Sequence, residues 1–166
     1  MTLVWSRVDS KLIHGQIVAA WVPYLKAEVI VVANADTAGD LRAQKIMCLG
    51  LPPEISQAYF HSLQGLAEFL GGPELAGKRV LLIFKSLADA LEAIDAGLDL
   101  AELNLGNQAE QPPLNQGQRL AETFYARPEE LEALARLERR GLAVVLQSVP
   151  TSKSVKWRPS GSDYAV

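Results

Sequence analysis

One histidine, His14, lies in the stretch RVDSKLIHGQ, residues 7–16, between an apolar pair and a glycine. An apolar pattern with helical spacing begins at Ile17, so the free N–H groups of a first helical turn would lie close to the ring. Those groups and the helix dipole favour an anion. An imidazole is largely neutral and nucleophilic near pH 7. A nucleophilic nitrogen beside an anion-binding helix start is what transient attachment of a phosphoryl group needs.

The neighbours of His14 suit the same chemistry. Arg7 and Lys11 add positive charge to the segment. Gly15 would let the backbone approach a ligand closely, and Gln16 offers a side-chain amide, so both are predicted to bind the phosphoryl group. The alternative from the residues alone is that His14 satisfies a hydrogen bond within a loop. Both interpretations stay open on local grounds.

Composition narrows the class of protein. The chain has 166 residues, 49% hydrophobic and 21% charged, which fits one globular domain. Its formal net charge of -3 argues against nucleic-acid binding. Only two histidines occur, no carboxylate stands at ligand spacing from His14, and no GxSxG motif is present, so neither a metal site nor a serine hydrolase is expected. The single cysteine, Cys48, cannot form an intrachain disulfide and is predicted to be a small buried residue of a helix.

The N-terminus and the apolar runs bear on location. No basic leader followed by a long apolar stretch opens the chain, so a signal peptide is not expected. The longest apolar runs, VIVVA and VLLIF, have the length of strands and are too short to cross a bilayer. We therefore expect a cytoplasmic protein.

Short β-branched runs alternate with helical patterns along the chain, which is typical of a parallel sheet covered by helices. We predict a single open, doubly wound, mainly parallel α/β sheet with helices on both faces. The strands are expected at 3–8, 28–33, 55–60, 79–84, 101–106 and 142–149, and the helices at 15–27, 39–50, 63–71, 86–97 and 127–141.

Two segments depart from this alternation. Residues 106–119 are rich in Gln, Asn, Pro and Gly and are expected to form a long loop before a short antiparallel edge strand at 120–126. The polar tail 151–166 follows the main domain, 1–150, and is expected to belong to it or to fray. Trp157 in this tail could anchor a partner or stay exposed, whereas Trp21 is expected to pack in the core.

Ligands of such sheets bind at the carboxyl ends of the strands. Lys85 and Ser86 follow the fourth strand there, and Ser86 could bind a phosphoryl group or simply cap the next helix. Asn34, Asp36 and His61 end or follow the second and third strands, and His61 is expected to have a surface or loop role. The loop after the first strand holds the richest chemistry.

Several motifs together resemble a known family. RVDSKLIHGQIVAAWVPYL is similar to the opening motif of the mannose/fructose/sorbose-family IIB component of the bacterial phosphoenolpyruvate-dependent sugar phosphotransferase system. VVANADTAGDLRAQKIMCLGLPP resembles its second βα unit, RVLLIFKSLADALEAIDAG with ELNLGN its middle, and LEALARLERRGLAVVLQSVPT its last helix and strand.

The resemblance implies a phosphotransferase with a phosphohistidine intermediate. His14 would take a phosphoryl group on Nδ1 from a phosphohistidine of a IIA domain and pass it to a sugar bound by the membrane components IIC and IID. It implies no cofactor and a place at the inner face of the membrane. Asp9 would orient the loop or the imidazole, and Arg7 would offset charge on the transferring group. A local salt bridge between Arg7 and Asp9 is the alternative.

Some residues depart from the family pattern. Lys11 stands where a second arginine is usual; it keeps the charge and loses the planar two-bond grip. A regulatory phosphoprotein or binding module on the same fold is therefore an alternative function, and an unrelated enzyme on this architecture is a third. The sugar and the oligomeric state, a homodimer included, are left open.

Overall fold

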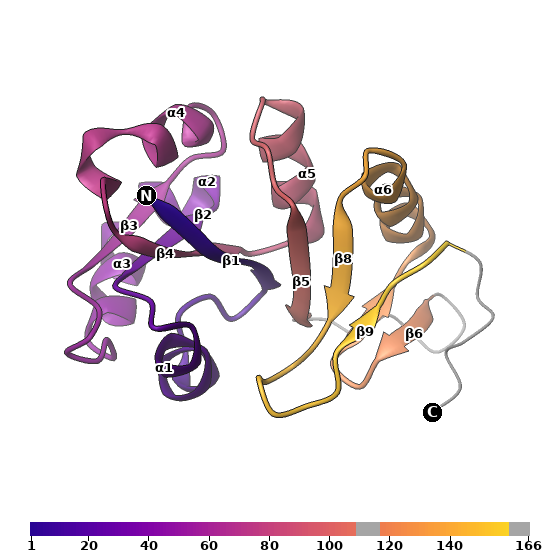
Figure 1. Cartoon of the computed structure of the whole chain (residues 1–166), viewed down its shortest axis with the longest axis horizontal. Coiled ribbons are helices and arrows are strands. Elements are labelled where there is room, and N and C mark those ends of the chain that lie inside the picture. Colours follow the sequence, from indigo (N-terminus) through magenta and orange to yellow (C-terminus); the bar gives the residue numbers. More distant parts are fainter. Residues whose placement is uncertain (109–116, 160–166) are drawn as a thin grey trace.

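The computed structural model describes residues 1–108 and 117–159 and contains one seven-stranded sheet (Figure 1). The strand order is β3-β2-β4-β1-β5-β8-β9, and all neighbours run parallel except β9, which is antiparallel to β8. β1 lies in the middle of the sheet, with β4, β2 and β3 on one side and β5, β8 and β9 on the other, which confirms the doubly wound prediction. The strands are β1 (Thr2–Asp9), β2 (Val29–Ala33), β3 (Gln57–His61), β4 (Arg79–Phe84), β5 (Glu102–Asn107), β8 (Ala143–Leu146) and β9 (Val155–Lys156).

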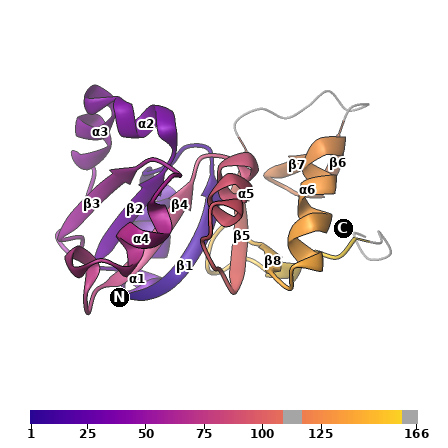
Figure 2. The same ribbon diagram turned by 90° about the horizontal axis from the view of Figure 1, so that it is seen from above.

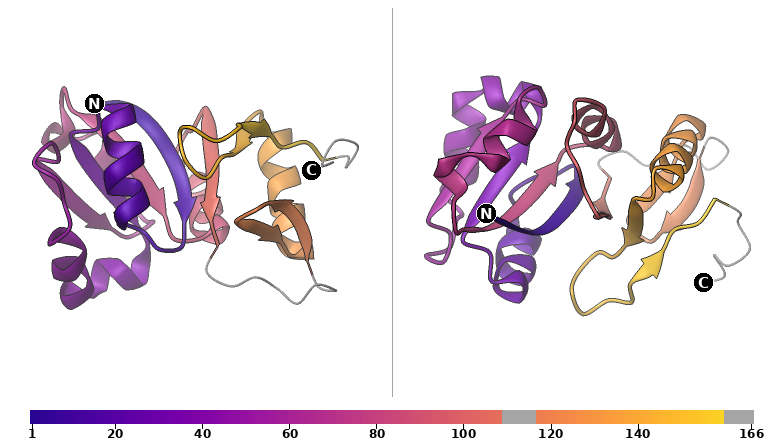
Figure 3. Two further views of the ribbon diagram at one scale, coloured as in Figure 1. Left: turned by 90° about the horizontal axis from the view of Figure 1, so that it is seen from below. Right: turned by 45° about the horizontal axis from the view of Figure 1, so that its top comes forward.

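Helices cover both faces of the sheet, as the left view of Figure 3 shows for the helix that contains α1. This helix begins with α-helical residues 15–16, passes into a π-helical segment, η1 (Ile17–Trp21), and continues into α1 (Val22–Leu25). The opposite face carries α4 (Leu66–Gly71), α5 (Leu87–Asp95) and α6 (Pro128–Arg139), with a short 3-10 turn, η2 (Pro73–Leu75), after α4 (Figure 1).

Alternation along the strands divides the core into two layers. Leu82 and Phe84 of β4 pack in the larger cluster, with residues of α4, α5 and α6. Leu81 and Ile83 face the other way and pack against the segment of η1 and α1, where Trp21 is fully buried as expected. Successive strand side chains point to opposite faces, so a strand with no polar alternation is buried on both sides.

The expected helix 39–50 is present as α3 (Leu41–Cys48), and a short helix that was not expected, α2 (Ala35–Gly39), precedes it. The break comes at Asp40, whose side chain accepts hydrogen bonds from the backbone N–H groups of Arg42 and Ala43 and thereby begins a new helix. No residue of α3 is buried. The prediction of a buried Cys48 is therefore wrong, since its thiol lies on an exposed helix.

The antiparallel edge strand arises from a different segment than expected. Residues 120–126 do not join the main sheet; β6 (Gln118–Ala121) and β7 (Phe124–Ala126) form a separate antiparallel pair. The edge strand is β9 of the tail, and Trp157 after it is 3% exposed, so it packs in the core and is not exposed. Parts of the predicted long loop (109–116) and of the predicted fraying tail (160–166) lie outside the described residues.

The carboxyl ends of the central strands form one edge of the molecule. Figure 2 shows α2, α3 and the β6–β7 pair at this edge, away from the N-terminus. The loop that carries His14 leaves β1 at the same edge. Within the described ranges, no helix is long and apolar enough to cross a membrane.

Candidate functional site

The centre of the site is Arg7, whose side chain is completely buried. Its Nε donates to Oδ2 of Asp9 at 3.0 Å, and Nη2 lies 3.0 Å from the same oxygen. The remaining N–H groups reach other acceptors: the Asn104 side chain, the carbonyl oxygens of Gln147 (2.9 Å) and Ser148 (3.1 Å), and Oε1 of Gln16 (3.4 Å). The Arg7–Asp9 salt bridge, which was the alternative interpretation of these two residues, is thus present, within a wider network.

Two neighbours shape the space around this guanidinium. Its carbon lies 5.1 Å from the ring centroid of Trp21, a cation–π distance. On the β5 side, a Cβ atom added to Gly106 would come within 2.1 Å of the guanidinium, so only glycine leaves room for it. Burial lowers the pKa of Arg7 from its ordinary value, although the charge and the hydrogen bond of Asp9 act in the opposite direction.

Asp9 connects Arg7 to His14. Its side chain is also completely buried and accepts hydrogen bonds from Arg7, from the backbone N–H of Lys11 (3.2 Å) and from Nδ2 of Asn107 (3.1 Å). Burial alone would raise the pKa of Asp9, but the hydrogen bond with His14 and the charge of Arg7 outweigh it and hold that pKa below its ordinary value. Asp9 is therefore an ionised carboxylate at neutral pH.

The contacts of His14 define which ring nitrogen carries the proton. Nε2 lies 3.2 Å from Oδ1 of Asp9, and an ionised carboxylate can only accept, so Nε2 carries the hydrogen. The backbone N–H of Gln16 points at Nδ1 over a longer distance of 3.4 Å. The ring is 21% exposed. The lone pair of Nδ1 therefore lies at the start of the first helix, in a ring that solvent can still reach.

The loop that presents His14 is held firmly. Leu12 and Ile13 are buried at its base, and Leu12 has φ 53°, a left-handed conformation that costs a leucine about 1–3 kcal/mol. Backbone hydrogen bonds from Leu12 to Asp9 and from Ser10 to Asn107, both 3.0 Å, fix the turn. The apolar pair beside His14 thus anchors the loop.

The other predicted site residues lie around this centre in different ways. Lys11 is exposed, and no contact of its ammonium occurs among the described residues. Gly15 is exposed, with nothing within 4 Å of where a Cβ would stand. The side-chain oxygen of Gln16 turns inward to Arg7 and to Asn107 (2.7 Å). Phosphoryl binding by Gly15 and Gln16 stays a prediction.

Ser86 and His61 have local roles. The Ser86 hydroxyl accepts from the backbone N–H of Asp89 at 3.1 Å, and the Asp89 carboxylate accepts from the backbone N–H of Ser86 at 3.0 Å, which makes a capping box at the start of α5. The capping role is present, and phosphoryl binding by Ser86 stays a prediction. His61 stacks on Phe69 with ring centroids 4.8 Å apart, and its Nδ1 lies 2.7 Å from the Ser62 carbonyl oxygen.

Sequence reasoning missed Asn104, a polar residue in the middle of the neighbouring strand β5. Asn104 is fully buried in β5 and touches Arg7, and its Nδ2 also donates to the carbonyl oxygens of Val145 and Gln147. Asn107 joins Asp9 to Gln16 through one amide group. A polar residue in the middle of an apolar strand was a detectable signal for Asn104, since a buried amide needs partners. The backbone carbonyl groups of Gln147 and Ser148, which follow β8, could not be recognised from the sequence.

Comparison with known proteins gives a consistent result. A family model described as "PTS system sorbose subfamily IIB component" matches residues 3–160. The chain is 30% identical over 153 residues to the N-acetylgalactosamine-specific phosphotransferase enzyme IIB component 2 of Escherichia coli (strain K12), covering 92% of this chain and 94% of that protein.

Two further relatives extend the comparison. The chain is 25% identical over 157 residues to the mannose-specific EIIAB component of the phosphotransferase system of Escherichia coli (strain K12), and spans only 47% of that longer protein. The crystal structure of the IIBSor domain of the sorbose permease from Klebsiella pneumoniae superposes with a TM-score of 0.81, at 25% identity and with 93% of each chain covered.

Proposed function

This chain belongs to the sorbose-subfamily IIB components of the phosphotransferase system, a family whose general role is phosphoryl transfer, and we propose that His14 is the residue that carries the phosphoryl group. The observation that carries the proposal is the orientation of the ring. Asp9 holds Nε2, and Nδ1 keeps its lone pair beside the exposed start of the helix. Nδ1 is thus the proposed nucleophile.

The proposed transfer has two steps. Nδ1 of His14 attacks the phosphorus of a phosphohistidine, the donor N–P bond breaks, and its electron pair returns to the donor ring. His14 keeps its Nε2 proton, so its ring gains positive charge, which the ionised carboxylate of Asp9 stabilises at 3.2 Å. A sugar hydroxyl oxygen then attacks phosphorus, the bond to Nδ1 breaks, and the hydroxyl proton passes to a base or to water.

Arg7 and Lys11 take different parts in this proposal. The five N–H groups of Arg7 already have acceptors, and its side chain is fully buried. Arg7 therefore acts through Asp9, by keeping it ionised and in place. Lys11 is exposed on the same loop and is the proposed cation for the phosphoryl group or for the partner.

The partners follow from the family. The relative named EIIAB joins this type of domain to a longer chain, which supports a IIA phosphohistidine as the donor. The sugar would be bound by the membrane components IIC and IID, with this chain associating peripherally at the inner face of the membrane. No cofactor enters either step.

The first test is phosphorylation itself. The protein is incubated with phosphoenolpyruvate, the two general phosphotransferase proteins and a matching IIA, and its intact mass is measured at neutral or mildly basic pH. We expect one acid-labile phosphoryl group on the wild type and none on His14→Ala. His61→Ala is the matched control, since the chain has 2 histidines, and it should be phosphorylated normally.

Two outcomes would contradict the proposal: no adduct when the IIA is itself shown to be phosphorylated, or an adduct that persists in His14→Ala. Long-range proton–nitrogen NMR spectra of the histidine rings then test the nitrogen, with phosphorus expected on Nδ1 and the proton on Nε2. Sugar phosphorylation with vesicles that contain IIC and IID separates transport from a purely regulatory phosphoprotein.

A further inference from the structure

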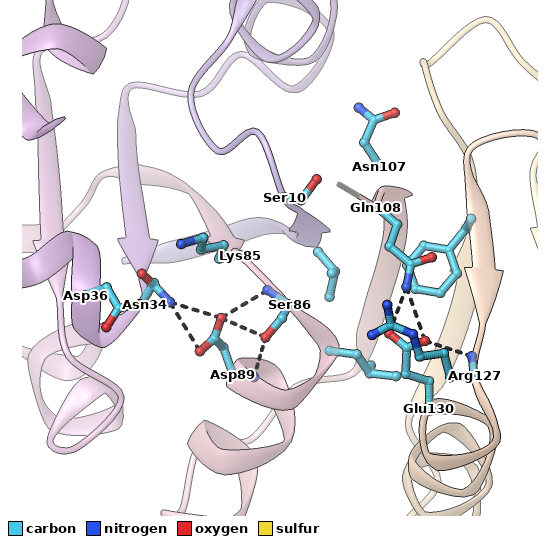
Figure 4. A pocket seen from close by; sticks show the side chains of 13 residues that line it. Ser10, Asn34, Asp36, Lys85, Ser86, Asp89, Asn107, Gln108, Arg127 and Glu130 are labelled. Atoms are coloured by element: carbon cyan, nitrogen blue, oxygen red, sulfur yellow. Dashed lines mark hydrogen bonds between the residues drawn. The ribbon is translucent and has the colours of Figure 1, made fainter. Parts of the chain in front are cut away.

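A cavity of about 410 Å³ opens at the carboxyl edge of the sheet, beside the His14 loop (Figure 4). Its volume lies within the range of about 300–1,000 Å³ that is usual for small-molecule sites. His14 is not part of its wall. The wall comes from the ends of β1, β2, β4 and β5, from the start of α5 and from β7 and the start of α6: Val8, Ser10, Asn34, Asp36, Lys85, Ser86, Leu87, Asp89, Asn107, Gln108, Phe124, Arg127 and Glu130.

Two of the carboxylates in this wall are already engaged. Asp89 accepts hydrogen bonds from the N–H and hydroxyl of Ser86 and from Nδ2 of Asn34. Glu130 accepts from Nε2 of Gln108 at 2.9 Å and from the N–H of Arg127 at 2.8 Å. Figure 4 shows these two networks on opposite sides of the cavity. These hydrogen bonds hold the side chains of the wall in place. The Asp89 carboxylate also lies at the positive N-terminal end of the α5 dipole.

Four side chains at the cavity, Ser10, Lys85, Asn107 and Asp36, have a polar group without a partner among the described residues. The hydroxyl of Ser10 is buried and makes no hydrogen bond. The ammonium of Lys85 has no ion pair, and Oδ1 of Asn107 accepts nothing, although its Nδ2 donates twice. A buried hydroxyl without a partner is costly, so it points to a ligand group that completes it.

The mixture of free groups indicates the class of ligand. Lys85 can only donate, Oδ1 of Asn107 can only accept, and the Ser10 hydroxyl can do both. Three carboxylates face two cations in the wall, and this excess of negative charge disfavours a phosphate dianion. Hydroxyl groups donate and accept equally well, and the apolar side chains in the wall, Val8, Leu87 and Phe124, suit the C–H surface of a sugar-like ring.

We propose that this cavity binds a neutral polyhydroxylated molecule the size of a monosaccharide, through Lys85, Ser10 and Asn107. The same Asn107 amide holds Asp9 and Gln16, so a ligand here touches the network that positions His14. Binding does not depend on phosphorylation of His14 and is measured without any phosphoryl donor. If no ligand binds in the cavity, the proposed phosphorylation of His14 is not contradicted. If His14 is not phosphorylated, ligand binding in the cavity is not contradicted.

The test is an NMR titration of the unphosphorylated, nitrogen-15-labelled protein. The probes are mannose, fructose and sorbitol, with inorganic phosphate and a hexose phosphate as charged comparisons. We expect saturable shifts of the Ser10, Lys85 and Asn107 amides with at least one neutral probe, at a dissociation constant on the order of a millimolar.

Three variants make the test specific. Ser10→Ala and Lys85→Met should each weaken binding of that probe about tenfold, whereas Lys153→Met, at an exposed lysine of the tail, should leave it unchanged. Amide spectra show whether each variant is folded. The proposal is overturned if no neutral probe gives saturable shifts, if both cavity variants bind as the wild type does, or if inorganic phosphate binds more tightly than every neutral probe.

Discussion

Two arginine–aspartate clusters lie at opposite ends of the sheet and differ mainly in their exposure to solvent. At the carboxyl edge, the side chains of Arg7 and Asp9 are both 0% exposed and 3.0 Å apart. At the far end of α5, Asp95 pairs with Arg136 (3.3 Å) and Arg140 (2.6 Å) while each side chain stays more than 40% exposed.

Both aspartates have a lowered pKa, but for different reasons. The pKa of Asp95 falls through the hydrogen bond of Arg140 in solvent, whereas that of Asp9 falls despite burial. The distance between the charges is similar in the two clusters, so burial and not distance sets what each pair does for the protein. The buried pair positions His14, and the exposed pair joins two helix ends.

The largest effect is expected from breaking the buried pair. Asp9→Asn leaves the charge of Arg7 buried without its counterion, which should lower the free energy of unfolding by about 3–5 kcal/mol. Urea unfolding of the variant and the wild type measures the difference. If His14 carries the phosphoryl group as proposed, the same variant should be phosphorylated much more slowly, since the phosphorylated ring would lose the carboxylate that stabilises its positive charge.

A double variant separates charge from packing. In Arg7→Met/Asp9→Leu no uncompensated charge remains, so part of the loss in Asp9→Asn should be recovered. If the double variant instead has a lower free energy of unfolding than Asp9→Asn, by as much as a second independent core substitution would cost, side-chain packing and not charge dominates the stability of this cluster.

A smaller loss of stability is expected when the space beside the Arg7 guanidinium is filled. Gly106→Ala adds a Cβ within 2.1 Å of the guanidinium and should cost about 1–3 kcal/mol. Gly15→Ala is the matched variant on the same edge: it meets nothing within 4 Å and should change stability by about 0–1 kcal/mol in the favourable direction. Urea unfolding again gives both values, and equal losses would contradict the close approach of β5 to Arg7.

The sequence predicted the sheet and the position of His14 well, because both rest on local patterns. The apolar runs VIVVA and VLLIF are β2 and the core of β4, and the alternation of strands and helices indicated the doubly wound order. The loop after β1 was recognised because unusual residue types gather there within ten positions.

The errors came from features that depend on distant parts of the chain. Cys48 was placed inside because its helix has apolar residues, but among the described residues only Met47 of α3 packs against the core, and Cys48 itself is exposed. β9 pairs with β8 although it lies in a mostly polar tail, since pairing at an edge and burial of Trp157 are tertiary effects. The acceptors of Arg7 at Gln147 and Ser148 are backbone carbonyl groups, which no sequence pattern marks.

The stability that the buried Arg7–Asp9 pair contributes should depend on pH. The native pKa of Asp9 lies below the ordinary value of about 3.9, so the buried pair contributes fully above about pH 4 and is lost as pH falls through that native pKa. The stability difference between wild type and Asp9→Asn should thus be constant near neutral pH and shrink in acid. In a His14→Ala background the lost hydrogen bond raises the pKa of Asp9, and the decline should begin at a higher pH. Urea midpoints across this range measure both curves, and a difference that grows in acid would contradict the lowered pKa.

The smallest effect is expected at the exposed cluster. Asp95→Asn removes the shared carboxylate of Arg136 and Arg140, but both arginines are 45% exposed and water replaces the lost partner. At physiological salt the urea midpoint should not change measurably, and at low salt a slight loss should appear because screening of exposed charges is weaker. A loss comparable to that of Asp9→Asn would mean that the contact between α5 and α6 depends on this pair, and that exposure does not distinguish the two clusters.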